Sequence, residues 1–184
     1  MHSPLHSEVI MGPVEIEPGL NALQCPVSKG FWIPLQSYLA WRERHRDRAI
    51  PLPSEATPVG EDDSARAALF CPESGCLLQR FKVGQGLPFR IDRSPVTGGI
   101  WLDQGEWEAL KSRDLHAELH QVFTAGYQKK VRSAQLQQTV LQTFQGKIGD
   151  EDFVKVSEFK SWLTQHPRSR DIICYLLDSE KPEA

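Results

Sequence analysis

The sequence predicts an α+β protein that consists of two small β units, each a hairpin with a short helix, followed by a C-terminal helical segment. Three observations predict this fold. Short strand-like runs alternate with glycine-containing turns in residues 67–112, a nine-residue motif from this segment has a counterpart within residues 1–52, and apolar residues recur at helical spacing over residues 113–184. Residues 53–66, which are rich in proline and acidic residues, are predicted to form a linker.

Turn signals place the elements of the two β units. In the first unit, residues 35–48 are predicted to form a helix. In the second unit, strand-like runs at residues 77–83 and 88–92 lie on either side of Gly84-Gln85-Gly86, which is typical of a hairpin loop. A short helix over residues 104–112 is expected to complete that unit.

The repeated motif relates the two β units. Cys25-Pro-Val-Ser-Lys-Gly-Phe-Trp-Ile33 aligns with Ser94-Pro-Val-Thr-Gly-Gly-Ile-Trp-Leu102, which lies 69 residues further on. Pro, Val, Gly and Trp occupy the same positions in both copies, and each copy is followed by an expected helix with an aromatic residue, Tyr38 or Trp107. The repeat therefore predicts two related halves that pack together.

The C-terminal segment contains three predicted helices. Apolar residues recur through residues 115–144, which predicts one long helix, and Asp150 is expected to cap the helix that follows. His166-Pro167 should end this second helix, since a proline disfavours helical backbone in the residue before it. Residues 172–177 should form a last short helix, and the apolar stripes of all three are expected to pack into a core.

Residues 71–110 carry a resemblance to a known family. The chain has Cys71-Pro72, then Ser94-Pro95, the run Gly98-Gly99-Ile100-Trp101-Leu102-Asp103, and Gly105-Glu106 before an apolar helix. This pattern resembles the bacterial zinc ribbons of the transcription-factor-IIB type (zf-TFIIB), whose members carry two Cys-Pro-x-Cys knuckles and a Gly-Gly-x-Trp-Leu-Asp run. A fainter echo covers residues 25–41. The resemblance implies a zinc-ribbon fold for both β units, and it implies fold more strongly than function.

The residues at the family's four ligand positions determine what to expect of the metal. These positions hold Cys71, Ser74, Ser94 and Thr97. A structural zinc site needs four good ligands, and neutral hydroxyls are poor ones, so neither zinc nor any other cofactor is expected. Burial of aromatic side chains such as Trp32 and Trp101 against the helical segment is expected to replace the free energy that the metal would supply. A ribbon that has lost its metal should still bring the four side chains together.

An alternative metal site combines two cysteines with two histidines. Cys71 and Cys76 have four residues between them, and His116 and His120 lie one helical turn apart, so both pairs have spacings that can bind metal. The chain lacks a second cysteine pair, which disfavours this alternative.

Composition and motifs exclude several classes of function. The net charge is −3 and the pI is about 6.1, so any nucleic-acid binding must be local rather than a property of the whole surface. The sequence shows no apolar run long enough to span a membrane, no secretory signal pattern, no phosphate-binding loop and no nucleophile elbow. We therefore expect a cytoplasmic protein that is not an enzyme.

Two functions from different classes follow. The first is a non-catalytic protein-interaction or adaptor module on a metal-free ribbon scaffold, with another protein as its partner. The alternative is a nucleic-acid or transcription-associated protein that binds through the arginine-rich helix of residues 42–48. Formation of a homodimer through the 114–145 helix is a further alternative. The candidate binding residues are Arg42, Arg44, Arg46, Arg48, Trp32 and Trp101.

Overall fold

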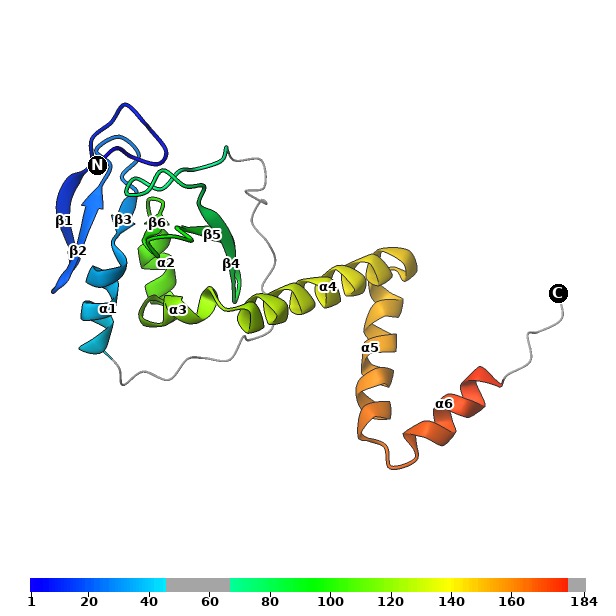
Figure 1. The fold of residues 1–184 in the computed structure, drawn as a ribbon. Helices are drawn as coiled ribbons and strands as arrows, with labels where there is room; N and C mark the ends of the chain where they lie inside the picture. The colour runs from blue at the N-terminus through cyan, green and yellow to red at the C-terminus, as the bar shows by residue number, and fades with distance from the viewer. Residues whose placement is uncertain (46–66, 179–184) are drawn as a thin grey trace. The chain divides into compact units, whose positions relative to one another are not determined.

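The computed structural model describes residues 1–45 and 67–178, and the predicted linker lies outside these ranges. The chain divides into two compact bodies, the N-terminal body (residues 1–135) and the C-terminal body (residues 136–184), with the boundary inside helix α4 (Ala125–Ile148). The N-terminal body contains strands and helices and includes the described parts of both predicted β units, whereas the described part of the C-terminal body is helical (Figure 1). The predicted α+β class is therefore confirmed.

One antiparallel sheet of six strands forms the centre of the N-terminal body. Its strands are β1 (Gly12–Glu17), β2 (Leu20–Gln24), β3 (Phe31–Ile33), β4 (Gln79–Gly84), β5 (Leu87–Arg93) and β6 (Ile100–Leu102). Their order across the sheet is β1-β2-β3-β6-β5-β4. Each β unit thus contributes three neighbouring strands, and the two units join at β3 and β6 (Figure 1).

The pairing of β3 with β6 relates the two units by an approximate two-fold axis. Trp32 lies opposite Trp101, which is its counterpart in the sequence repeat. The flanking pairs, Phe31 with Leu102 and Ile33 with Ile100, exchange repeat positions across this central pair. The two copies of the motif therefore lie antiparallel and side by side, and the two halves pack together as the repeat predicts.

The predicted hairpin of the second unit is present as β4 and β5. Gln85 and Gly86 connect these strands with φ angles of 53° and 76°, so both residues are left-handed. A two-residue loop of this kind matches the right-handed twist of the strands that it joins. Local turn chemistry was therefore sufficient to predict this part of the sheet.

Helices α1 (Leu35–Glu43) and α2 (Glu106–Ser112) follow β3 and β6 and cover the same face of the sheet. The rings of Trp41 on α1 and Trp107 on α2 meet edge to face, with centroids 5.7 Å apart. α1 is shorter than predicted, although residues 46–48 lie outside the described ranges. α2 begins two residues later than predicted, because Gly105 precedes it with a left-handed φ of 84°.

Two apolar clusters lie on opposite faces of the sheet. Side chains alternate between the faces along a strand, so Ile33 and Ile100 join the cluster under α1 and α2, whereas Trp32 and Trp101 point the other way. The second cluster also includes Met11, Cys25, Leu69, Cys71 and Leu78. The two tryptophans therefore pack against the segments before β1 and β4, and the expectation that they pack against the C-terminal helical segment is wrong. The same expectation is confirmed for Phe31, Ile100 and Trp107, which pack in the cluster that contains Leu115 and Leu119.

The single long helix predicted over residues 115–144 is replaced by three shorter helices. These are η2, a 3-10 helix (His116–Glu118), α3 (Leu119–Val122), and α4. Thr124 causes the last break, because its hydroxyl accepts a hydrogen bond from the N–H of Tyr127 and so caps the start of α4. The proposed dimer helix over residues 114–145 is therefore not one continuous helix.

The C-terminal body contains the last part of α4, α5 (Asp150–Gln165) and α6 (Ser169–Leu177). Gly149, with a φ of 84°, occupies the cap position before α5, so Asp150 lies inside the helix and is not its cap. Pro167 follows the end of α5, as predicted. No side chain of the described residues 136–178 is buried, and the expected core packing of these helices is therefore wrong.

Candidate functional site

The four side chains at the family's ligand positions converge at one end of the second β unit. Cys71 Sγ lies 3.6 Å from Thr97 Oγ1. Cys76 Sγ lies 3.5 Å from Ser94 Oγ and accepts a hydrogen bond of 3.1 Å from Ser74 Oγ. The expected convergence is therefore observed, with Cys76 as a fifth member of the cluster.

These side chains are carried by turns that share one pattern of backbone hydrogen bonds. The N–H of the first residue donates to the carbonyl five residues later, and the N–H four residues later donates back to the carbonyl of the first residue. Turns that begin at Cys25, Cys71 and Ser94 all have this pattern, with N–O distances of 2.8 to 3.0 Å. In each turn the side chain of the first residue also accepts the N–H three residues later. The repeat in the sequence is thus a repeat of turn geometry.

A related turn at Ser3-Pro4-Leu5-His6 was not predicted from the sequence; it shares the side-chain hydrogen bond of the other three turns but not their backbone pattern, since the N–H of Ser3 donates to the carbonyl of Val9, six residues later. The N–H of His6 donates to Ser3 Oγ, as the equivalent N–H groups do in the other three turns. An isolated bridge between His2 and Ile10 matches the one between Phe70 and Leu77. Ser3 therefore occupies the position of Cys71 in the first unit. The signal that could have identified it is the proline that follows the first residue in all four turns.

Each β unit retains one buried thiol at these positions, Cys25 in the first and Cys71 in the second. Burial raises the pKa of each thiol, but hydrogen bonds lower it by more, chiefly from Ser28 and then Ser3 at Cys25, and from Ser74 and then Ser94 at Cys71. The resulting pKa of each thiol is about 7, below the ordinary value of 9.0. Both thiols are therefore partly ionised near neutral pH.

The donor atoms at these turns do not fit a structural zinc ion. In residues 1–45 and 67–178 no group of three or more His, Cys, Asp or Glu side chains is placed to hold a metal. The alternative site is not formed either, because His116 packs against Trp41 and Trp107 in the cluster on the opposite face from Cys71. The absence of zinc remains a prediction, which metal analysis of the purified protein tests.

The two candidate tryptophans are core residues. Trp32 is 0% exposed and Trp101 is 1% exposed. Their indole N–H groups donate to carboxylates, Trp32 to Glu73 at 2.8 Å and Trp101 to Asp103 at 2.9 Å. Direct contact of these rings with a binding partner is therefore incompatible with their burial.

The candidate arginines divide into two described and two undescribed residues. Arg44 Nε donates to the carbonyl of Ala40 and Nη2 to that of Gly19, so its guanidinium ties α1 to the first hairpin. Arg42 lies 3.9 Å from the carboxylate of Glu118. Arg46 and Arg48 lie outside the described residues. The guanidinium groups of Arg42 and Arg44 thus have intramolecular contacts.

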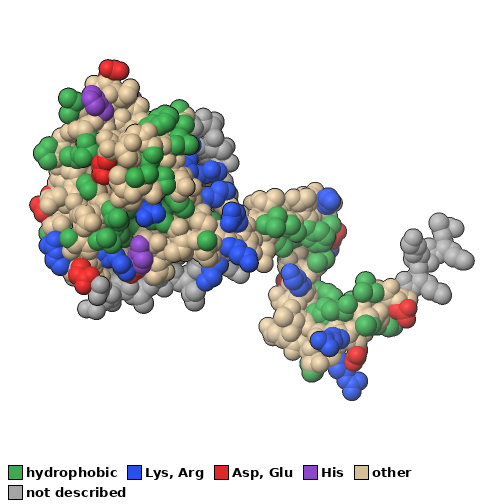
Figure 2. Space-filling view, viewed as in Figure 1, with side chains coloured by type: hydrophobic (Ala, Val, Ile, Leu, Met, Phe, Trp, Pro, Cys, Tyr) green, Lys and Arg blue, Asp and Glu red, His purple; other side chains and the backbone are tan. Residues whose placement is uncertain are grey.

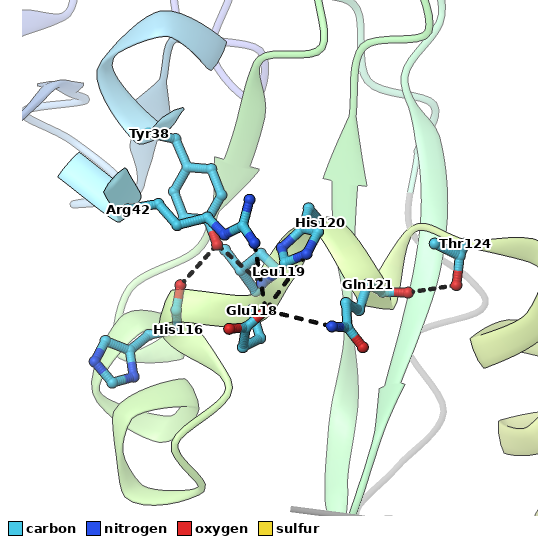
Figure 3. Close-up of polar contacts among 8 residues, drawn as sticks. All are labelled: Tyr38, Arg42, His116, Glu118, Leu119, His120, Gln121 and Thr124. Atoms are coloured by element: carbon cyan, nitrogen blue, oxygen red, sulfur yellow. Dashed lines mark hydrogen bonds and ion pairs between the residues drawn. The ribbon is translucent and has the colours of Figure 1, made fainter. Parts of the chain in front are cut away.

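A polar network fixes η2 and α3 against α1 (Figure 3). The hydroxyl of Tyr38 donates to the carbonyl of His116 at 3.1 Å and accepts the N–H of Leu119 at 2.9 Å. The Glu118 carboxylate lies between Arg42 and His120, and its Oε2 is 3.4 Å from His120 Nε2. Burial and the Arg42 charge lower the pKa of His120, although Glu118 opposes this.

The Tyr38 hydroxyl should contribute strongly to stability. We expect Tyr38→Phe to lower the free energy of unfolding by about 1–3 kcal/mol, because it leaves the buried N–H of Leu119 without its acceptor. Urea unfolding followed by circular dichroism measures this change. Tyr127→Phe is the control, since its hydroxyl is only partly buried, where it donates to the carbonyl of Val83 and also interacts with Gln85, and its loss should cost no more than about 1 kcal/mol. Equal effects of the two substitutions would contradict the role of Tyr38.

The C-terminal body exposes an unusual amount of apolar surface. On α4 to α6 the large apolar side chains that face solvent are Leu136, Val140, Leu141, Phe144, Val154, Val156, Phe159, Trp162, Ile173, Tyr175, Leu176 and Leu177. Hydrophobic side chains gather over the end of α4 and over α6 (Figure 2). None of the described helices is both long enough and apolar enough to cross a membrane. Apolar patches of this kind on a protein surface mark sites of interaction.

Comparison of the chain with protein-family models, curated proteins and solved structures found no match. The resemblance to zinc ribbons therefore remains a prediction.

Proposed function

We propose that the protein is a non-catalytic interaction module in which the N-terminal body is a rigid scaffold and the C-terminal body docks onto a partner polypeptide. The observation that carries this proposal is the exposed apolar face of α4 to α6, none of whose side chains within residues 136–178 is buried. A segment without a core of its own gains little from folding alone. A partner that covers these side chains would supply the missing burial, at about 25 cal/mol per Å² of apolar surface.

The spacing of the exposed residues favours a helical partner. Leu136, Val140 and Phe144 recur every four residues along α4, and Val156, Phe159 and Trp162 recur every three along α5. Ridges of this kind pack into the grooves between side chains of another helix. We therefore propose that the partner presents an apolar helical face.

The scaffold itself offers less to a ligand. Its convergent thiol and hydroxyl cluster is partly buried, and its two tryptophans lie in the core. The nucleic-acid alternative gains no support from Arg42 and Arg44, whose guanidinium groups contact Glu118 and backbone carbonyls. That alternative stays a prediction.

Site-specific photocrosslinking in cells tests the proposed function. A benzophenone amino acid at Val140 or Trp162 should give adducts with a polypeptide of defined mass, identified by mass spectrometry. Val96, which lies in the N-terminal body and is 70% exposed, is the matched control and should give none. Phe159→Ser should reduce the adduct formed at position 162 by about tenfold, because it removes a neighbouring large apolar contact. Equal crosslinking from all three positions, or none from Val140 and Trp162, would overturn the proposal.

A further inference from the structure

Helix α5 combines an exposed apolar stripe with an acidic first turn and with arginines shortly beyond its last residue. Val156, Phe159 and Trp162 form the stripe and are 43%, 42% and 50% exposed. A neighbouring side of the helix contacts its own unit, where the rings of Phe153 and Phe144 lie 6.4 Å apart. The exposed stripe is therefore free to contact a second protein.

The residues near the two ends of α5 carry opposite charges. Asp150, Glu151 and Asp152 form its first turn, and Arg168 and Arg170 lie three and five residues beyond its last residue, Gln165, at the start of α6. Acidic residues at the start of a helix also complement the partial positive charge of that end. A second helix of the same sequence can satisfy both ends at once only if it runs in the opposite direction. In a parallel pair, acidic turn would face acidic turn and arginines would face arginines.

We propose that the partner of α5 is a second copy of this chain, with the two α5 helices packed antiparallel. This inference rests on the proposed function and names its partner. The midpoint between Asp150 and Arg168 falls at Phe159, which places the two Phe159 rings next to the two-fold axis. The same register sets Val156 of one copy opposite Trp162 of the other, so the apolar stripes face each other.

The remaining charges of α5 are compatible with this register. Lys155 lies opposite Leu163, and Glu158 lies opposite Lys160, so no two like charges are opposed. Lys155 also has an acceptor within its own helix, the carboxylate of Asp152 at 2.9 Å. The two helix dipoles run antiparallel, which favours the pair further. A symmetric interface needs this kind of self-complementary surface.

Charge reversal with cross-rescue tests the arrangement in the full-length protein. Sedimentation equilibrium should show that the wild-type chain dimerises. The double variants E151K/D152K and R168E/R170E should each weaken self-association by at least about tenfold, because each opposes like charges at both ends of the pair. An equimolar mixture of the two variants should form a heterodimer with nearly the wild-type affinity. The control K129E/K130E reverses two exposed charges on the first part of α4 and should leave the affinity unchanged.

Three results would overturn the inference: a monomeric wild-type protein, charge-reversal variants that dimerise as well as the wild type, or a mixture that associates no better than the separate variants. A monomeric wild-type protein that still forms specific adducts from Trp162 with another polypeptide would overturn the antiparallel pair and leave the proposed function standing. Absence of both dimer and adducts would overturn the two proposals together.

Discussion

Residues 67–112 expressed alone should be unfolded, although they contain every element of the second β unit. In the intact protein β6 forms the centre of the sheet only because β3 lies beside it. Without the first unit, Trp101 loses its cross-strand neighbour Trp32, and the core under α2 loses Tyr38 and Trp41. Truncation at residue 112 also removes Leu115 and Leu119, which are 1% and 0% exposed.

The lost burial is large compared with the stability that so short a chain can have. Burial of one large apolar side chain is worth about 1.5–3 kcal/mol, and chains of this size rarely gain more than about 3–5 kcal/mol from a single core. Far-UV circular dichroism of the fragment should show no cooperative unfolding. Addition of zinc should not restore structure, because the ligand positions hold one cysteine, two serines and a threonine. Residues 1–135, which form the whole N-terminal body, are the control and should unfold cooperatively. A sigmoidal transition for residues 67–112 would contradict the prediction.

What the sequence predicted correctly depends on local chemistry. The hairpin at Gln85-Gly86 and the end of α5 before Pro167 are determined by the backbone preferences of neighbouring residues. The repeat could be recognised because its two copies have proline, valine, glycine and tryptophan at the same positions. The turn at Ser3 was missed because it shares only serine and proline with the Ser94 turn, and the valine, glycine and tryptophan of the repeat are absent from it.

What the sequence did not predict depends on contacts between distant residues. The pairing of β3 with β6 merges two units into one sheet, and no local pattern encodes this pairing. Periodic apolar residues continue through the break at Thr124, because the helices on both sides of it have an apolar face. Periodicity likewise identifies an apolar face on α5 without showing what covers it. The sequence therefore predicted that Trp32 is buried but not which segments cover it, and it did not predict the exposure of Trp162.

The two glycines that precede the paired tryptophans should tolerate no side chain. A Cβ atom at Gly99 would overlap the Trp32 ring, and one at Gly30 would lie 2.5 Å from Trp101 Cζ2. Each glycine thus allows the close approach of the tryptophan from the other unit, which is the contact that joins the two halves. Because both rings are buried and hydrogen-bonded, neither can move aside without disturbing the core.

We therefore expect Gly30→Ala and Gly99→Ala each to lower the free energy of unfolding by about 3 kcal/mol, at the upper end of the usual cost of overpacking. Urea unfolding followed by far-UV circular dichroism measures this without relying on tryptophan fluorescence. Gly12→Ala is the control, since nothing lies within 4 Å of its added Cβ, and its effect should stay within about 0.5 kcal/mol. The double variant Gly99→Ala with Trp32→Phe should be less destabilised than the sum of its single variants, because the smaller ring relieves the overlap. Strictly additive effects would show that the cost of a side chain at Gly99 does not arise from the tryptophan that joins the two units.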